Sequence, residues 1–295
     1  MKNSKFTLGL VVIGLLALIP LNSSSHDNVS ADSVVLSKDN TMVLNSEVDG
    51  ESVSALIAQA KELDSNLSSR LKNPLNSGKG KPLYLFLNTP GGSIQSGMEL
   101  IEAMHGLGRP VNTITLFAAS MGFQIAQNLD DRLILKSGVL MSHQAQGEFS
   151  GFFGGVHPSQ VDSRYQLWLD RTREMDEQTV KRTNGKQTYE SYTNQYQHEM
   201  WLTGTKSVEQ GYADRIVTVK CDASLTGVST HHVNFMGLDI TYDLDNCPLN
   251  TSPMNVRMGG TPGGSVVTAS QIEDIKKKFL EQFEKNQKAV VPMYW

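Results

Sequence analysis

Two apolar segments of strand length, residues 82–88 and 111–117, are each followed by a segment with the residue spacing of a helix. The first, PLYLFLN, is apolar almost without interruption, which is typical of a parallel strand buried on both faces. Another strand-like segment follows at residues 131–135. Strands that alternate with helices of this length form right-handed βαβ units. The sequence therefore predicts an α/β protein built from repeated βαβ units.

The composition excludes several classes of protein. Hydrophobic residues make up 39% and charged residues 19%, which is compatible with a globular chain and argues against disorder. The 26 basic and 30 acidic residues leave a net charge of −4, so no basic excess is available to bind phosphate backbones. We expect no nucleic-acid partner. Two cysteines are too few for a four-cysteine zinc site.

The N-terminus has the layout of a secretory signal. Lys2 and Lys5 precede residues 6–21, an apolar run of 16 residues without charge. This run is shorter than the about 18 to 20 residues that span a bilayer comfortably. Val29-Ser30-Ala31 fits the cleavage pattern, with sites at Ser23 or Ser25 as alternatives. Residues 1–31 are therefore predicted to be a signal peptide or a membrane anchor of an exported, periplasmic or otherwise extracytoplasmic protein. A cytoplasmic protein with a buried N-terminal helix is the alternative.

Export changes what the two cysteines, Cys221 and Cys247, can do. In an oxidising compartment they could close a loop with a sequence separation of 26 residues. Such a bridge stabilises a protein by about 3 kcal/mol, mainly by restricting the unfolded chain. Two unrelated buried thiols are the alternative.

The remaining segments suggest three parts. Residues 159–197 are polar and helical in character, and residues 201–219 return to a compact helix-and-strand pattern. Beyond Cys221 the sequence predicts a less regular tail with a linker at residues 251–265 and one amphipathic helix, whose apolar face carries Ile272, Ile275, Phe279, Leu280 and Phe283. We expect a leader (1–31), a main domain (32–220) and a C-terminal extension (221–295).

Small residues at both strand-to-helix junctions are candidates for a site, because ligands of α/β sheets bind beyond the carboxyl ends of the strands. Residues 88–93, NTPGGS, lack the Lys of a phosphate loop, but their paired glycines can direct N–H groups at a negative charge. Ser120 lies in the second junction, AASMG, near the positive end of the next helix. Helix capping is its simpler role. Of the seven histidines, His143 ends a strand-like run, although a structural role is the alternative.

Three motifs in this order, LFLNTPGGSIQSGMEL, AASMG and LMSHQ, resemble the ClpP-type serine peptidases, the proteolytic subunits of Clp proteases. The resemblance runs from about Val34 to Ile216. It implies a ClpP/crotonase-like fold and homo-oligomeric, heptameric rings stacked face to face, with the helices of residues 159–197 forming the contact between rings. It also implies that Ser120 is the nucleophile, that His143 is the general base, and that the backbone N–H groups of Gly92 and Met121 form the oxyanion hole.

The sequence departs from the family pattern at the third catalytic position. Glu199 stands where the family has an Asp, two residues before an aromatic. Glutamate orients the histidine in some Ser-His-acid sites, so we expect an active Ser120-His143-Glu199 triad. A poor fit of Glu199 would instead leave a weak or inactive assembly or binding protein. His198-Glu199 does not begin a zinc-peptidase motif, because Leu202 stands where the second His is required.

The expected activity is therefore that of a serine endopeptidase that acts on peptides or unfolded chains without a cofactor or metal. Residues 148–157, EFSGFFGGVH, form an apparent insertion that could cover the cleft. An ATP-driven unfoldase is a doubtful partner, because an exported protein has no ATP outside the cytoplasm. An acyl-thioester hydratase or isomerase of the crotonase type shares the oxyanion hole, but that chemistry makes no use of the Ser120-His143 pair.

Overall fold

The computed structural model describes residues 32–70, 80–146, 157–235, 238–250, 252–258 and 277. All of them belong to one compact unit that begins at residue 31. The predicted leader (1–31) lies outside the described residues. So does the predicted insertion over the cleft, except for its last residue, and so does the C-terminal amphipathic helix, except for residue 277. In the described part of the chain, no helix is long and apolar enough to cross a lipid bilayer.

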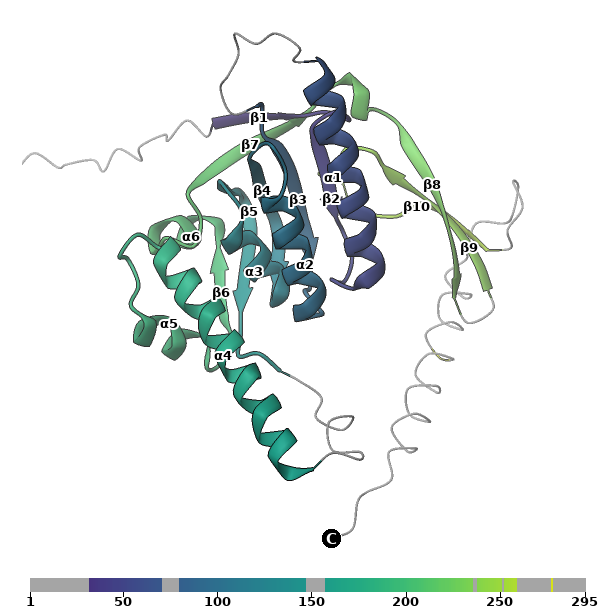
Figure 1. Cartoon of the computed structure of the whole chain (residues 1–295). Coiled ribbons are helices and arrows are strands. Elements are labelled where there is room, and N and C mark those ends of the chain that lie inside the picture. Colours follow the sequence, from purple (N-terminus) through teal and green to yellow (C-terminus); the bar gives the residue numbers. More distant parts are fainter. Residues whose placement is uncertain are drawn as a thin grey trace, which may run out of the picture. The chain divides into compact units, whose positions relative to one another are not determined.

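The centre of the molecule is a seven-stranded, mostly parallel sheet (Figure 1), which confirms the predicted α/β class. Six strands follow one another as parallel neighbours. Their order is β1 (Asp32–Leu36), β7 (Arg215–Cys221), β5 (Arg132–Ser142), β4 (Val111–Ala119), β3 (Leu83–Thr89) and β2 (Thr41–Leu44). The short strand β6 (Met200–Thr203) pairs antiparallel with β5.

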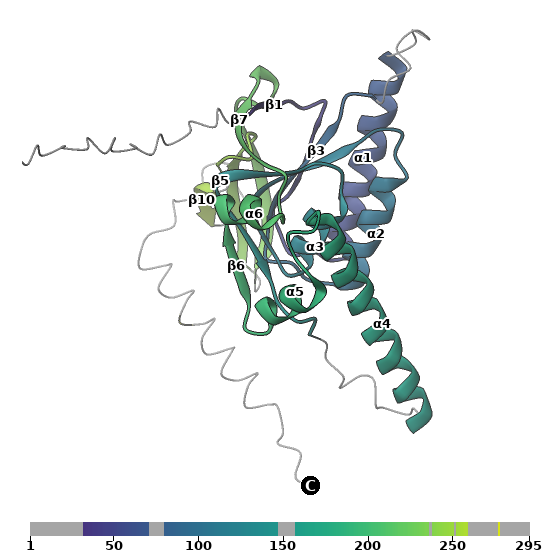
Figure 2. The same ribbon diagram turned by 90° about the vertical axis from the view of Figure 1, so that its left-hand side faces the viewer.

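Helices α1, α2 and α3 gather on one side of this sheet (Figure 2). The described helices are α1 (Gly50–Arg70), α2 (Ile94–His105), α3 (Met121–Asn128), α4 (Pro158–Arg182), α5 (Tyr189–Tyr196) and α6 (Gly204–Gln210). Strand β3 shows how the sequence specifies this layering. Its Leu83, Leu85 and Leu87 belong to the apolar cluster that includes residues of α1, α2 and α3, whereas Phe86 belongs to a second cluster. Successive side chains of a strand point to opposite faces, so an uninterrupted apolar run is buried on both.

The segment after β7 is more regular than the sequence suggests. A short 3-10 turn (Ala223–Leu225) leads into an antiparallel sheet of β8 (Val228–Phe235), β9 (Leu238–Asp245) and β10 (Met254–Met258). The prediction of a less regular tail is therefore wrong for residues 228–245, and the predicted linker contains a strand at its start. These strands are rich in Thr, Asn, Asp and His, which weakens an apolar alternation.

A disulfide bond joins Cys221, at the end of β7, to Cys247, just beyond β9. The Cα atoms are 5.9 Å apart, a usual separation for a disulfide. The second sheet is thus tied covalently to the edge region of the first.

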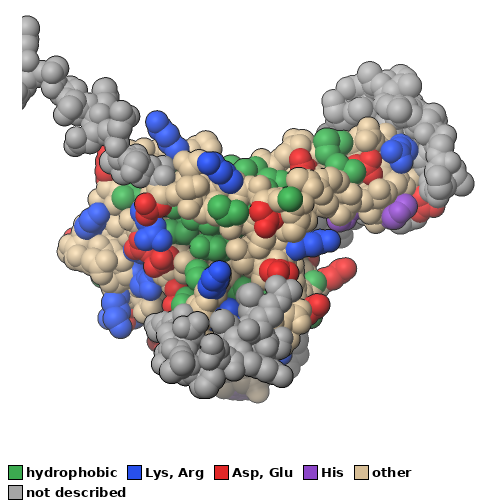
Figure 3. Space-filling model, turned by 90° about the horizontal axis from the view of Figure 1, so that it is seen from above, with side chains coloured by type: hydrophobic (Ala, Val, Ile, Leu, Met, Phe, Trp, Pro, Cys, Tyr) green, Lys and Arg blue, Asp and Glu red, His purple; other side chains and the backbone are tan. Residues whose placement is uncertain are grey.

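Charged side chains on the face shown in Figure 3 are of both signs and lie interspersed. This face carries no continuous basic patch of the kind that binds a phosphate backbone.

Candidate active site

Ser120 occupies a strained turn between the end of β4 and the start of α3. Its backbone has φ 54° and ψ −119°, a conformation that a residue with a side chain rarely adopts. The backbone N–H of Ser120 donates to the carbonyl of Met141 on β5 at 2.9 Å, which holds the turn against the sheet. The Ser120 hydroxyl makes no capping hydrogen bond to α3. Helix capping therefore does not explain this serine in the structure.

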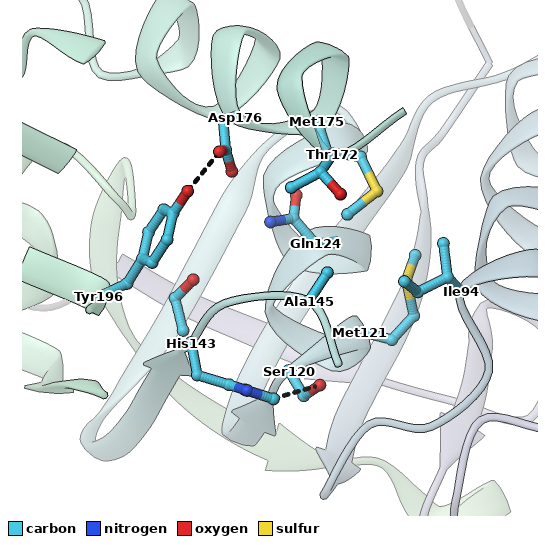
Figure 4. A pocket seen from close by; sticks show the side chains of 11 residues that line it. Ile94, Ser120, Met121, Gln124, His143, Ala145, Thr172, Met175, Asp176 and Tyr196 are labelled. Atoms are coloured by element: carbon cyan, nitrogen blue, oxygen red, sulfur yellow. Dashed lines mark hydrogen bonds between the residues drawn. The ribbon is translucent and has the colours of Figure 1, made fainter. Parts of the chain in front are cut away.

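The Ser120 hydroxyl instead faces His143, the residue that follows β5. His143 Nε2 lies 2.8 Å from Ser120 Oγ (Figure 4). The pairing of the parent strands explains this proximity, because Ala119 on β4 is opposite Met141 on β5 in a parallel ladder. Both side chains thus leave the carboxyl ends of neighbouring parallel strands, where α/β proteins place their sites. A hydroxyl and an imidazole at this distance form the core of a nucleophile-base pair.

Gly91, the first of the paired glycines after β3, packs directly against the Ser120 turn, whereas Gly92 packs against Val48 and Glu47. Gly91 has φ 96° and Gly92 has φ 145°, and a Cβ added to Gly91 would lie 2.7 Å from Ser120 Cβ. Two backbone hydrogen bonds with Val48 fix the turn. The N–H of Val48 donates to the carbonyl of Gly91 at 2.8 Å, and the N–H of Ser93 donates to the carbonyl of Val48 at 2.7 Å. The N–H groups of Gly92 and Met121 donate to no described backbone carbonyl or side chain.

Glu199 directly precedes β6, with a backbone φ of 66°, and its carboxylate is bound to Trp201. The last pair of the β5–β6 ladder is Ser142 with Met200, and one further step would set His143 opposite Glu199. Glu199 Oε2 accepts a hydrogen bond from Trp201 Nε1 at 3.0 Å. No hydrogen bond joins Glu199 to His143 in the described structure.

A pocket, partly open to solvent, is lined by Ser120 and His143 at one end and by residues of helices α4 and α5 at the other (Figure 4). Ile94, Met121 and Met175 form its apolar lining. Asp176 and Tyr196 line it at a distance from Ser120, and there the Tyr196 hydroxyl donates to Asp176 Oδ2 at 2.5 Å.

Burial dominates the electrostatics of this acidic pair. The Asp176 side chain belongs to a residue that is only 4% exposed, and burial raises the pKa of its carboxyl to about 6, against the opposing effect of the Tyr196 hydrogen bond. The pKa of Tyr196 is raised as well, first by burial and then by its bond to Asp176. Sequence reasoning missed this pair. No sequence pattern indicated it, because Asp176 and Tyr196 both lie in a polar stretch of helical character.

A network of uncharged polar side chains supports the base of the pocket. Ser142 Oγ and the Tyr192 hydroxyl are 2.9 Å apart, and Thr179 donates to Gln124 Oε1 at 3.3 Å. Tyr192 is fully buried, and burial raises its pKa. The described residues contain no group of three or more His, Cys, Asp or Glu side chains placed to hold a metal ion.

Comparison with known proteins places these features in a family. The family model described as Clp protease matches residues 25–220, about two thirds of the chain. The ATP-dependent Clp protease proteolytic subunit of Streptococcus gordonii is 29% identical over 185 residues, which cover 62% of this chain and 86% of that protein. The subunits of that name from Streptococcus agalactiae and Streptococcus pneumoniae are 28% and 29% identical over the same shares. A matching family model over most of the chain, on a mostly parallel α/β sheet, means that this chain belongs to the Clp protease family.

Proposed function

We propose that this protein is a serine endopeptidase in which Ser120 is the nucleophile and His143 the general base. The observation that carries the proposal is the 2.8 Å contact between His143 Nε2 and Ser120 Oγ at a strained turn. Ser120 Oγ attacks the peptide carbonyl carbon while His143 Nε2 takes the hydroxyl proton. His143 then gives that proton to the leaving amine, and water activated by the same imidazole hydrolyses the acyl-enzyme.

The backbone N–H groups of Gly92 and Met121 form the oxyanion hole in this mechanism. They lie on the two turns that pack against each other at Ser120, and neither is committed to a described backbone partner. Donors placed where charge develops in the tetrahedral intermediate are effective because they need no reorganisation. Loss of one such donor typically raises the barrier by about 2.7 to 4 kcal/mol.

Glu199 completes the triad in the proposal, after a change of side-chain rotamer. The register of the β5–β6 ladder supports this role, because one further step would set Glu199 opposite His143 and bring the carboxylate toward Nδ1 once it leaves Trp201. A carboxylate there holds the imidazole in the tautomer with a free Nε2 and stabilises the imidazolium that forms during attack. The longer glutamate side chain, compared with aspartate, provides the extra reach that this rotation requires.

A second candidate function is that of a Clp-like assembly or binding protein with weak turnover. The bond between Glu199 and Trp201 favours this alternative, because it leaves His143 Nδ1 without a hydrogen-bond partner among the described residues. Turnover would then depend on how often Glu199 leaves Trp201.

Self-association into rings and export are also part of the proposal. Helix α4 exposes large apolar side chains, with Tyr165 44%, Leu167 55% and Leu169 37% exposed, and a second copy of the chain would cover them.

The disulfide supports an oxidising compartment, since such bonds are rare in the cytosol. The names of the relatives include the term ATP-dependent. The proposal for this chain does not include that dependence. Peptides or unfolded chains are the substrates in either compartment.

The decisive test is covalent labelling with a fluorophosphonate probe, followed by peptide hydrolysis. Wild-type protein is expected to be labelled on Ser120 and to hydrolyse unstructured peptides, whereas Ser120→Ala does neither. Ser163→Ala is the matched control, because Ser163 is exposed on α4 and outside the pocket. Equal hydrolysis by wild type and Ser120→Ala would contradict the assignment. Folded, oligomeric protein that is never labelled would favour the second candidate.

A further inference from the structure

Asp176 lines the same pocket as the reactive serine but takes no part in the proposed chemistry. Figure 4 shows Asp176 and Tyr196 at one end of the pocket and the Ser120-His143 contact at the other. Only Asp176 Oδ2 has a hydrogen-bond partner among the described residues, the hydroxyl of Tyr196. The second carboxylate oxygen accepts no hydrogen bond from them.

No cation in the described structure balances this buried carboxylate. The nearest arginines along α4 are committed elsewhere: Arg173 pairs with Glu177 at 2.8 Å, and Arg171 donates to Gln95 at 3.0 Å. The other titratable groups that face the pocket or pack behind it are His143, Tyr192 and Tyr196. An isolated carboxylate that is 4% exposed is costly to bury. A ligand that brings a hydrogen-bond donor and a positive charge would recover much of that cost.

The pocket lining combines apolar side chains with one acidic group. Ser120 lines the same pocket, so in the proposed reaction a side chain bound there belongs to the residue whose carbonyl is attacked. Ile94, Met121 and Met175 contribute apolar atoms to the lining, and Asp176 contributes the acid. Lysine and arginine side chains match this lining, with an apolar stem and a cationic head.

We propose that Asp176 is a specificity-determining residue, which selects substrates with a basic side chain on the acyl side of the scissile bond. This inference rests on the proposed peptidase function and adds a substrate class to it. Discrimination between substrates arises because a neutral apolar side chain leaves the buried Asp176 carboxylate without a positive charge beside it. An ammonium or guanidinium group supplies that charge.

The test uses two fluorogenic peptides that differ only at this position, one with lysine and one with norleucine, which has the same stem without the ammonium group. Full-length wild-type protein is expected to show a kcat/KM for the lysine peptide about tenfold or more above that for norleucine. Asp176→Asn should lose most of this preference by slowing the lysine peptide, with norleucine changed by less than about twofold. Glu177→Gln is the charge-matched control, because Glu177 is exposed and does not line the pocket.

A second variant keeps the test decisive if Asp176→Asn folds poorly. Tyr196→Phe removes the phenol donor but keeps the carboxylate, so the lysine preference should persist. A norleucine preference in wild type, or an equal loss on both peptides in folded Asp176→Asn, would overturn the inference and leave the peptidase assignment intact. Absence of both peptide hydrolysis and fluorophosphonate labelling of Ser120 would instead remove the peptidase function itself, and the inference with it.

Discussion

Trp201 holds the carboxylate of Glu199 by a hydrogen bond from its indole Nε1 to Oε2 at 3.0 Å. Glu199 directly precedes β6, and one further step of the β5–β6 ladder would set it opposite His143. In the proposed triad, the indole and the imidazole of His143 compete for the same carboxylate.

Removing the indole donor should raise activity. Trp201→Phe keeps an aromatic ring against Phe117, whose centroid is 6.4 Å from that of Trp201, but it releases Glu199 to rotate toward His143. We expect kcat for peptide hydrolysis to rise several-fold in this variant.

Glu199→Gln should lower kcat by about 10² to 10⁴, the range expected when the orienting acid is lost. Unchanged kcat in Glu199→Gln would exclude Glu199 from the triad.

A methyl group at Gly91 should destroy the site and destabilise the fold. The added Cβ would lie 2.5 Å from the carbonyl oxygen of Ala119 and 2.7 Å from Ser120 Cβ, at a backbone φ of 96°. We expect Gly91→Ala to lose about 2 kcal/mol of unfolding free energy and most fluorophosphonate labelling. Gly50→Ala is the matched control, since a Cβ there would meet nothing within 4 Å. Urea unfolding and probe labelling measure both effects, and equal behaviour of the two variants would contradict the packing argument.

The raised pKa of Asp176 makes stability depend on pH in a defined direction. Burial raises this pKa from 3.8 to about 6, so between these values the folded protein holds a proton that the unfolded chain releases. The contribution of Asp176 to the unfolding free energy is therefore most favourable below about pH 4 and is lost as the pH rises to about 6. Asp176→Asn, which keeps an oxygen for Tyr196, should be more stable than wild type by roughly 2 kcal/mol at pH 7.5.

The matching measurement is the difference in unfolding free energy between Asp176→Asn and wild type at two pH values. This difference should shrink as the pH falls from 7.5 toward 4. A difference that stays constant over this range would show that Asp176 is not titrating there.

Reduction of the disulfide should destabilise the protein without removing the site. Cys221 and Cys247 close a segment with a sequence separation of 26 residues, for which a bridge is worth about 3 kcal/mol. We expect the double variant Cys221→Ser/Cys247→Ser to unfold at a lower temperature. Ser120 labelling at a temperature where both proteins are folded should be little changed, because the bond lies outside the pocket. An unchanged Tm on reduction of wild type would count against a structural role.

The exposed apolar side chains of α4 predict the assembly state. Leu167 is 55% exposed, and a charge there would disrupt a contact between copies of the chain. Leu167→Glu should therefore sediment as smaller species than wild type. Ser163→Glu adds the same charge on the same helix at a position that is already polar and should leave assembly unchanged. Equal sedimentation of Leu167→Glu and wild type would place the contact elsewhere.

Features that depend on local periodicity and turn chemistry were predictable from the sequence. The apolar run that became β3 indicated a strand buried on both faces, and the order of strands and helices indicated a parallel sheet. The positions of Ser120 and His143 at the ends of neighbouring strands follow from that sheet, but their roles were predictable only from the resemblance to the ClpP-type serine peptidases.

Features that depend on contacts between distant segments were not predictable. Asp176 meets Tyr196 because α4 and α5 fold back on each other, and each residue alone reads as part of a solvated helix. The second sheet lacked a strong apolar alternation, since its strands pair through polar residues such as Thr230 and Asp243, whose side chains are hydrogen-bonded at 2.7 Å. The partner of Glu199 is a matter of rotamer, which no sequence pattern specifies.

The bond between Cys221 and Cys247 also determines what a cut in the chain would do. A single backbone cleavage between these two residues would leave the C-terminal fragment attached to the main sheet, because the bridge spans the gap. A nicked molecule of this kind would migrate as one species until its thiols are reduced. The protein is proposed to cleave polypeptides in the presence of many copies of itself. The bridge therefore holds a chain together after another copy has cut it between the two cysteines.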